Sequence, residues 1–146
     1  MANDELYTPK KVFDALKAKF DLDVCAPHDQ TYSSVPADKW FCICCADGLV
    51  DQWYGMVWMN PPFSKPSPWV DKFLSHANGI ALLPLSGNSQ WWQRIWKSEA
   101  TCIMIPPNMG FINSDGEERK IMYGISLWAL GDGVEYLKNS HLGHWR

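Results

Sequence analysis

The chain has 146 residues, of which 47% are hydrophobic and 20% are charged. A single domain of ordinary size (~150 residues) accounts for this length, and the composition excludes intrinsic disorder. The net charge of -3 argues against a protein that holds nucleic acid by bulk positive charge, although a local basic patch is compatible with it.

The beginning of the chain (1–5) is polar and acidic, which is not typical of a secretory signal. The sequence also lacks an apolar run of about 18 residues, the length that a membrane span requires. We therefore expect no membrane partner, and the cytoplasm is the expected location.

Apolar periodicity predicts alternating helices and strands along the chain. Pro9 suits the first turn of a helix over residues 10–20, because apolar side chains in that segment share one face. Apolar runs predict strands at 22–26, 40–45, 56–59, 80–85, 101–105 and 124–130. Further helices are predicted at 68–77, after Asn88 or Ser89, and as a short turn at 134–138, with loops at 28–39 and 113–119.

This alternation predicts an α/β fold with mostly parallel strands and flanking helices. In such sheets, ligands bind in the crevice at the carboxyl ends of the strands. Two polar segments follow predicted strands, Asp23–Pro27 and Asn60–Phe63. We expect them to share a cleft.

The cysteines are odd in number and contain no C-x-x-C pair: Cys25, Cys42, Cys44, Cys45 and Cys102. Three of them lie within residues 42–45 and could form half of a metal site, but a second ligand pair at zinc spacing is missing. We therefore expect reduced, mostly buried thiols and no bound metal.

The segment Asn60–Phe63 (N-P-P-F) is the most specific motif of the chain. Methylation of an exocyclic amine requires acceptors for its N–H bonds, because the nitrogen lone pair is otherwise delocalised into the ring. The side-chain carbonyl of Asn60 and the backbone carbonyl of Pro61 are two such acceptors on a stiff segment. Phe63 offers an aromatic face to a planar base. A turn that only ends the strand is the alternative interpretation.

N-P-P-F resembles the [D/N/S]-P-P-[Y/F/W] motif of amino methyltransferases that use S-adenosylmethionine. Further segments occur in the order seen in phage-type DNA N6-adenine methyltransferases of the Dam-like family: Tyr7–Pro9, Asp23–Ala26, Asp47–Leu49 with Trp53, and Leu83–Pro84. The resemblance covers roughly residues 6–130. It implies that residues 1–146 form a single-domain, Rossmann-like methyltransferase sheet with no separate target-recognition domain.

The resemblance also implies a reaction and its site. The implied activity is methyl transfer from S-adenosylmethionine to adenine N6 in DNA, with the base extruded from the duplex into the cleft. The implied catalytic residues are Asn60, Pro61, Pro62 and Phe63. The implied cofactor contacts are Tyr7, Thr8, Pro9, Asp23, Val24, Cys25 and Ala26, with the Asp23 carboxylate on the donor's ammonium. Asp38 and Asp47 are both candidates to bind the ribose hydroxyls.

Residues near the predicted strand ends are candidates to contact nucleic acid: Ser64, Lys65, Trp91 and Arg94, with Lys72, Trp92 and Lys97 nearby. A solvated face for the basic residues and a core position for the tryptophans are the alternatives. His28 could touch a ligand, and residues 114–120 could form an exposed loop that closes over substrate.

One departure from the family pattern keeps another function open. The segment Asp23–His28 contains no glycine, whereas the family's cofactor loop is usually glycine-rich. A non-catalytic relic of this fold that binds nucleic acid or a host protein is therefore the alternative. A methyltransferase acting on RNA or on a protein amide is another. The sequence predicts neither the recognised DNA site nor the oligomeric state.

Overall fold

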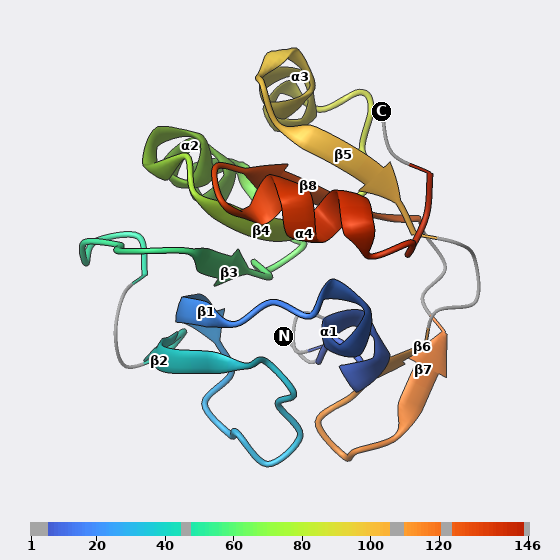
Figure 1. The fold of residues 1–146 in the computed structure, drawn as a ribbon. Coiled ribbons are helices and arrows are strands. Elements are labelled where there is room, and N and C mark those ends of the chain that lie inside the picture. Colours follow the sequence, from blue (N-terminus) through green and yellow to red (C-terminus); the bar gives the residue numbers. More distant parts are fainter. Residues whose placement is uncertain (1–5, 45–47, 106–109, 121–123, 145–146) are drawn as a thin grey trace.

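The computed structural model describes residues 6–44, 48–105, 110–120 and 124–144 (Figure 1). The helices in these ranges are α1 (Lys10–Leu16), α2 (Ser67–His76), α3 (Gln90–Lys97) and α4 (Gly133–Asn139). The strands are β1 (Phe20–Ala26), β2 (Ala37–Cys42), β3 (Val57–Met59), β4 (Gly79–Pro84), β5 (Thr101–Met104), β6 (Gly110–Ile112), β7 (Glu118–Lys120) and β8 (Ile125–Leu130).

The main sheet is mixed and mostly parallel, in the order β2-β1-β3-β4-β8-β5. The pairs β1–β2, β1–β3 and β3–β4 are parallel, whereas β8 lies antiparallel to both of its neighbours. Strands β6 and β7 form a separate antiparallel pair. The prediction of an α/β fold with a mostly parallel sheet is therefore confirmed.

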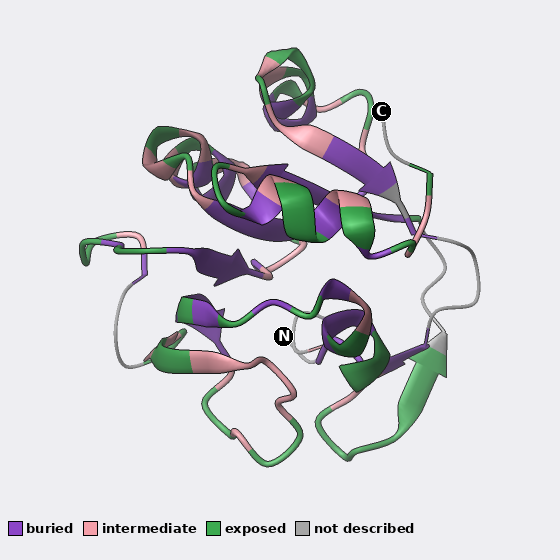
Figure 2. Cartoon of the chain, in the orientation of Figure 1, coloured by how far each residue is buried: buried purple, intermediate pink, exposed green. Residues whose placement is uncertain are grey.

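Helices cover both faces of the main sheet, which gives three layers (Figure 1). Helices α1 and α4 share one apolar cluster with Trp58, Ile80 and Leu82 of the sheet. Helices α2 and α3 share a second apolar cluster with the intervening strand residues, such as Met59 and Ala81, whose side chains point to the opposite face. Strand β4 is buried over its whole length, whereas the described side chains of β7 are exposed (Figure 2).

The first helix is shorter than predicted, and its end shapes the start of the sheet. Lys17 takes a left-handed conformation with φ of 53° and donates its backbone N–H to Phe13, which ends the helix at Leu16. Phe20, predicted to lie on the helix face, is instead the first residue of β1 and pairs with Ala37. The same pairing explains why β2 begins at Ala37 and not at Trp40.

The prediction of a loop over residues 113–119 is wrong in part, because Glu118–Lys120 forms β7 against β6. Asn113 makes the turn by accepting the backbone N–H groups of Asp115 and Glu117 on its side-chain oxygen. The hairpin is held from outside, since β6 pairs with Tyr7 through Ile112. A short polar strand that depends on such a tertiary contact shows no alternation of apolar and polar residues, so its sequence does not predict it.

Among the described residues, no helix combines the length and the apolar character that crossing a membrane requires.

The buried central strand predicts a large difference between two leucines near one another in the sequence. Leu82 is 0% exposed and Leu85, just after β4, is 38% exposed. Leu82→Ala should lower the free energy of unfolding by about 2–5 kcal/mol, because it leaves a cavity between the sheet and its helices. Leu85→Ala should cost well under half as much. Urea unfolding of both variants checks this, and equal losses would contradict the described core.

Candidate functional site at the carboxyl edge of the sheet

The order of the parallel strands creates a switch point between β1 and β3. After β1 the chain moves to the edge strand β2, and then crosses to the other side of β1 to form β3. Leu22 pairs with Val57 and Asp23 with Trp58, so β1 and β3 end side by side. A crevice at the carboxyl ends of two such strands is the usual ligand site of an open α/β sheet.

A pocket lies at this switch point. The space between its walls is about 520 Å³, a volume that includes the open solvent at its mouth. The side chains that line it come from the N-terminal segment, both strand ends and the loop between β1 and β2: Leu6, Tyr7, Thr8, Asp23, Cys25, Pro27, Ser33, Ser34, Val35, Ile43, Trp58, Asn60 and Pro62.

Asp23 is the buried acidic group of this pocket. Asp23 is only 3% exposed, and its side-chain oxygen accepts a hydrogen bond from the backbone N–H of Cys25 at 3.2 Å. Burial raises the pKa of Asp23 from 3.8 to about 7, and the hydrogen bond from Cys25 opposes this only in part. No lysine, arginine or histidine of the described residues forms an ion pair with it. A cationic ligand group would supply the missing partner.

Asn60 follows β3 directly and is oriented by the N-terminal segment. Its amide nitrogen donates to the backbone oxygen of Leu6 at 3.1 Å and to the hydroxyl of Thr8 at 3.4 Å. Within the described part of the chain, its side-chain oxygen accepts no hydrogen bond. Since Asn60 lines the pocket, this oxygen is the acceptor that it can offer to a ligand.

The N-terminal segment forms one wall of the pocket and is held at several points. Tyr7 donates its hydroxyl to the backbone oxygen of Asp29 at 2.9 Å and forms a backbone bridge with Ile112 of β6. Thr8 is 4% exposed and lines the pocket. Pro9 is the N-cap position of α1 and does not line it.

Other predicted site residues lie beside the pocket rather than in its lining. Val24 and Ala26 are 0% exposed, and Val24 packs in the core cluster of α2 and α3. Pro61 is buried, and Phe63 is half-buried against the core cluster of α1 and α4. Of the N-P-P-F motif, the pocket lining contains Asn60 and Pro62.

The expectation that Asp38 binds the ribose hydroxyls disagrees with its position. Asp38 is the second residue of β2 and lies at the amino end of that strand, whereas the pocket lies at the carboxyl ends. Its carboxylate pairs with Lys19 at 3.0 Å on the surface. The other candidate, Asp47, lies outside the described residues.

Gly48, the residue after Asp47, passes close to the backbone of β1. A Cβ atom on Gly48 would lie 2.1 Å from the backbone oxygen of Val24 in β1, so only glycine allows this approach. The backbone oxygen of Gly48 accepts the indole N–H of Trp53 at 2.6 Å and the ammonium of Lys72 at 2.9 Å. Lys72 is therefore part of the scaffold behind β1.

The residues expected to contact nucleic acid separate into two groups. Ser64 and Lys65 follow the motif and are exposed. Trp91 is 8% exposed and packs in the core, which corrects the expectation that it contacts nucleic acid. Arg94 donates to Asp71 and Ser67 of α2, each at 2.7 Å, and so ties the two helices together. Trp91 and Arg94 are absent from the pocket lining.

Several lining residues were missed by the sequence analysis. Ser33, Ser34 and Val35 belong to the predicted loop, and Trp58 and Ile43 lie in or near predicted strands. The loop returns along the pocket because the parallel pairing of β1 and β2 requires a crossover at this edge. A serine pair in a polar loop after the first strand was the one available signal.

The lining has the chemistry expected for a mixed polar and apolar cofactor. The buried Asp23 carboxyl suits a cationic group, the Ser33 and Ser34 hydroxyls suit hydroxyl or amide groups, and Trp58 and Ile43 offer apolar surface. These features fit S-adenosylmethionine, which carries an ammonium, a ribose and an adenine ring.

Fold and pocket together define the class: an α/β protein with a pocket at the switch point of a mostly parallel sheet. A family model described as DNA N-6-adenine-methyltransferase (Dam) matches residues 1–123. The chain therefore belongs to the DNA N-6-adenine-methyltransferase (Dam) family, and the resemblance seen in the sequence is confirmed.

A curated relative gives the same family. The DNA N-6-adenine-methyltransferase of Haemophilus phage HP1 (strain HP1c1) is 32% identical over 108 residues, which cover 68% of this chain. The match spans 60% of that relative's own length. No solved structure matches the chain.

The buried carboxyl group of Asp23 makes stability depend on pH in a defined direction. Its pKa is about 7 in the folded chain and near 3.8 when exposed, so folding takes up a proton between these values. Without ligand, the free energy of unfolding should fall by about 1.4 kcal/mol per pH unit over this range and level off above it. Asp23→Asn removes this contribution.

The measurement is urea unfolding of the wild-type chain and of Asp23→Asn at several pH values. The wild type should lose about 2 kcal/mol relative to the variant over the two pH units from 5 to 7, because the slope declines as the carboxyl ionises near pH 7. A difference that stays constant over this range would show that the Asp23 carboxyl is solvated.

Proposed function

We propose that the chain transfers a methyl group from S-adenosylmethionine to N6 of adenine in DNA. Family membership and the name of the phage relative, a DNA N-6-adenine-methyltransferase, support this activity. The observation that carries the proposal is that Asn60 and Asp23, from two neighbouring strand ends, line one pocket. The sheet order, with its switch point between β1 and β3, supports a Rossmann-like methyltransferase sheet.

Asp23 holds the donor in this proposal. S-adenosylmethionine, when bound, supplies an electrophilic methyl group on a sulfonium. The carboxylate of Asp23 pairs with the donor's ammonium, which replaces the proton that burial otherwise favours. Tyr7, Thr8, Cys25, Ser33 and Ser34 surround the remainder of the donor.

Asn60 orients the acceptor amine. Its amide nitrogen is held by Leu6 and Thr8, so its side-chain oxygen has one preferred direction. That oxygen and the backbone oxygen of Pro61 accept hydrogen bonds from the two N–H groups of the amine. These hydrogen bonds free the nitrogen lone pair and stabilise the positive charge that forms on the nitrogen during transfer. Pro62 and Phe63 contact the base, and the proton leaves to solvent after the transfer.

DNA approaches from the side of the motif in this proposal. Ser64 and Lys65 are exposed directly after Phe63 and contact the backbone next to the extruded base. We propose that residues 1–146 act as one methyltransferase domain without a separate target-recognition domain. Sequence preference then comes from loops around the pocket.

The role of Asn60 predicts a specific loss of chemistry. Asn60→Ala removes one acceptor for the amine, and such a loss typically lowers the rate by about 10²–10³. The rate of methyl transfer to DNA, measured in a single turnover with labelled donor, should fall by that factor. Affinity for S-adenosylmethionine, measured by calorimetry, should change much less. Asn139→Ala, an exposed asparagine of α4, is the matched control and should keep full activity.

The acceptor class is tested with the same labelled donor on DNA, RNA and protein. Label should enter DNA alone, and digestion of the product should release N6-methyladenine. Donor binding without transfer to any of the three would favour the non-catalytic alternative. An Asn60→Ala variant as fast as the wild type would reject the proposed role of this residue.

A further inference from the structure

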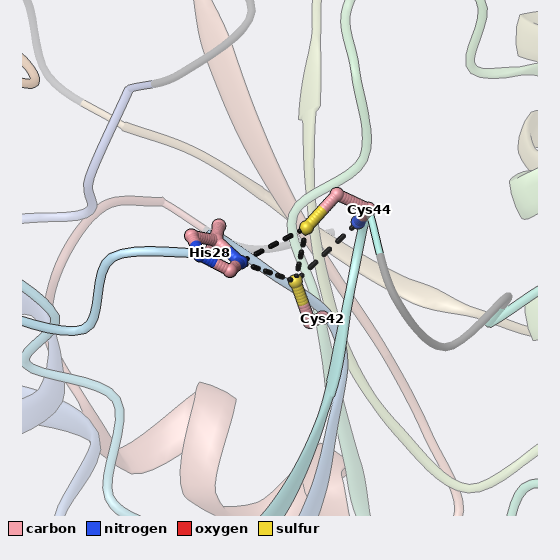
Figure 3. Close-up of side chains that lie close together, drawn as sticks. All are labelled: His28, Cys42 and Cys44. Atoms are coloured by element: carbon pink, nitrogen blue, oxygen red, sulfur yellow. Dashed lines mark hydrogen bonds between the residues drawn. The ribbon is translucent and has the colours of Figure 1, made fainter.

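His28, Cys42 and Cys44 form a cluster of potential metal ligands beside the pocket (Figure 3). Nδ1 of His28 lies 3.0 Å from Sγ of Cys44 and 3.5 Å from Sγ of Cys42. The two sulfurs are 2.8 Å apart. Figure 3 shows the imidazole and both sulfurs converging on one point, from two separate segments of the chain.

The strand register explains why these three side chains meet. Cys42 pairs with Ala26, and the backbone N–H of Ile43 donates to the oxygen of Ala26 at 2.8 Å. His28 lies two residues beyond Ala26, and Cys44 lies two residues beyond Cys42. Because the paired ends of β1 and β2 lie side by side, the segments that follow them bring His28 and Cys44 close to Cys42.

The ligand types select a class of metal. Two thiols and one imidazole are soft or intermediate ligands, which suit zinc and not the hard ions magnesium and calcium. Cys44 and His28 are exposed, and Cys42 is half-buried. An ion at this point is therefore open to water, which can complete a tetrahedral set.

We propose that His28, Cys42 and Cys44 bind one zinc-class divalent ion at the edge of the pocket. A tetrahedral ion with bonds of about 2.3 Å to sulfur and 2.0 Å to nitrogen holds its ligand atoms roughly 3.5–3.8 Å apart. The distance from His28 to Cys42 meets this requirement, whereas Cys44 needs to move away by about 0.5 Å from His28 and by about 1 Å from Cys42. The exposed side chain of Cys44 can make that movement.

This ion would connect two walls of the pocket. Pro27 and Ile43 both line the pocket, and each is the direct neighbour of a proposed ligand. A bond from the metal to His28 and to the two cysteines therefore joins the loop after β1 to the end of β2. We revise the expectation of no metal accordingly: the third ligand is a single histidine 14 residues before Cys42, which the pairing of β1 with β2 brings to the cysteines.

The test measures the metal directly and does not depend on methyl transfer. The full chain is purified under reducing conditions, loaded with Zn²⁺, dialysed and analysed for metal content. One zinc per chain is expected. Replacement by Co²⁺ should give the visible bands of a tetrahedral site and a thiolate-to-cobalt band in the near ultraviolet. An intact mass lower by two hydrogen atoms would instead show a disulfide, and would overturn the proposal.

Matched variants assign the ligands. Cys42→Ala, Cys44→Ala and His28→Asn should each weaken zinc affinity on the order of 100-fold or more, and the cysteine variants should weaken the thiolate-to-cobalt band. Cys102→Ala is the control for the thiols, because Cys102 is buried in β5 and burial raises its pKa to about 12. His141→Asn is the control for the imidazole. Zinc affinity that is equal in all variants, or no zinc bound by the wild type, would overturn the proposal.

Discussion

The parallel pairing of β1 with β3 is the constraint on which the site depends. It sets Asp23 beside Trp58 across the ladder, so the segments that follow the two strands leave the sheet at the same edge. The chain between them forms β2 on the far side of β1, and this crossover opens the crevice. Asp23 and Asn60 are 37 positions apart in the sequence, yet they line one pocket because of this pairing.

A second set of contacts closes the pocket from the N-terminal side. The amide of Asn60 holds Leu6 and Thr8, while Tyr7 between them bridges to Ile112 of the β6–β7 hairpin. The ring of Tyr7 meets that of Tyr32 edge to face at a centroid distance of 6.1 Å. The motif, the hairpin and the loop after β1 are thus connected through one short segment, so a shift of any one of them would move the wall of the pocket.

Long apolar runs were predictable from the sequence, and contacts made between distant segments were not. The strands that became β1, β3, β4, β5 and β8 were found because burial on both faces leaves continuous apolar runs. The hairpin was missed because β7 is polar and exposed and depends on its pairing with β6. Asp38 was a candidate by residue type alone, because its place at the amino end of β2 follows only from the register of that strand. His28 and the two cysteines likewise meet only through that register.

The absence of glycine after β1 is compatible with a ligand site, because the space for a ligand is not formed by the backbone of residues 23–28 alone. The loop that carries Ser33, Ser34 and Val35 lies across the pocket, and Tyr7 and Thr8 form the opposite wall. What the strand end contributes is a buried carboxyl group with no cationic partner among the described residues. A carboxyl group in that situation takes up either a proton or a cationic ligand, since an uncompensated buried charge is costly. In the proposed function, recognition of the ligand's positive charge at Asp23 therefore takes the place of a glycine-rich turn.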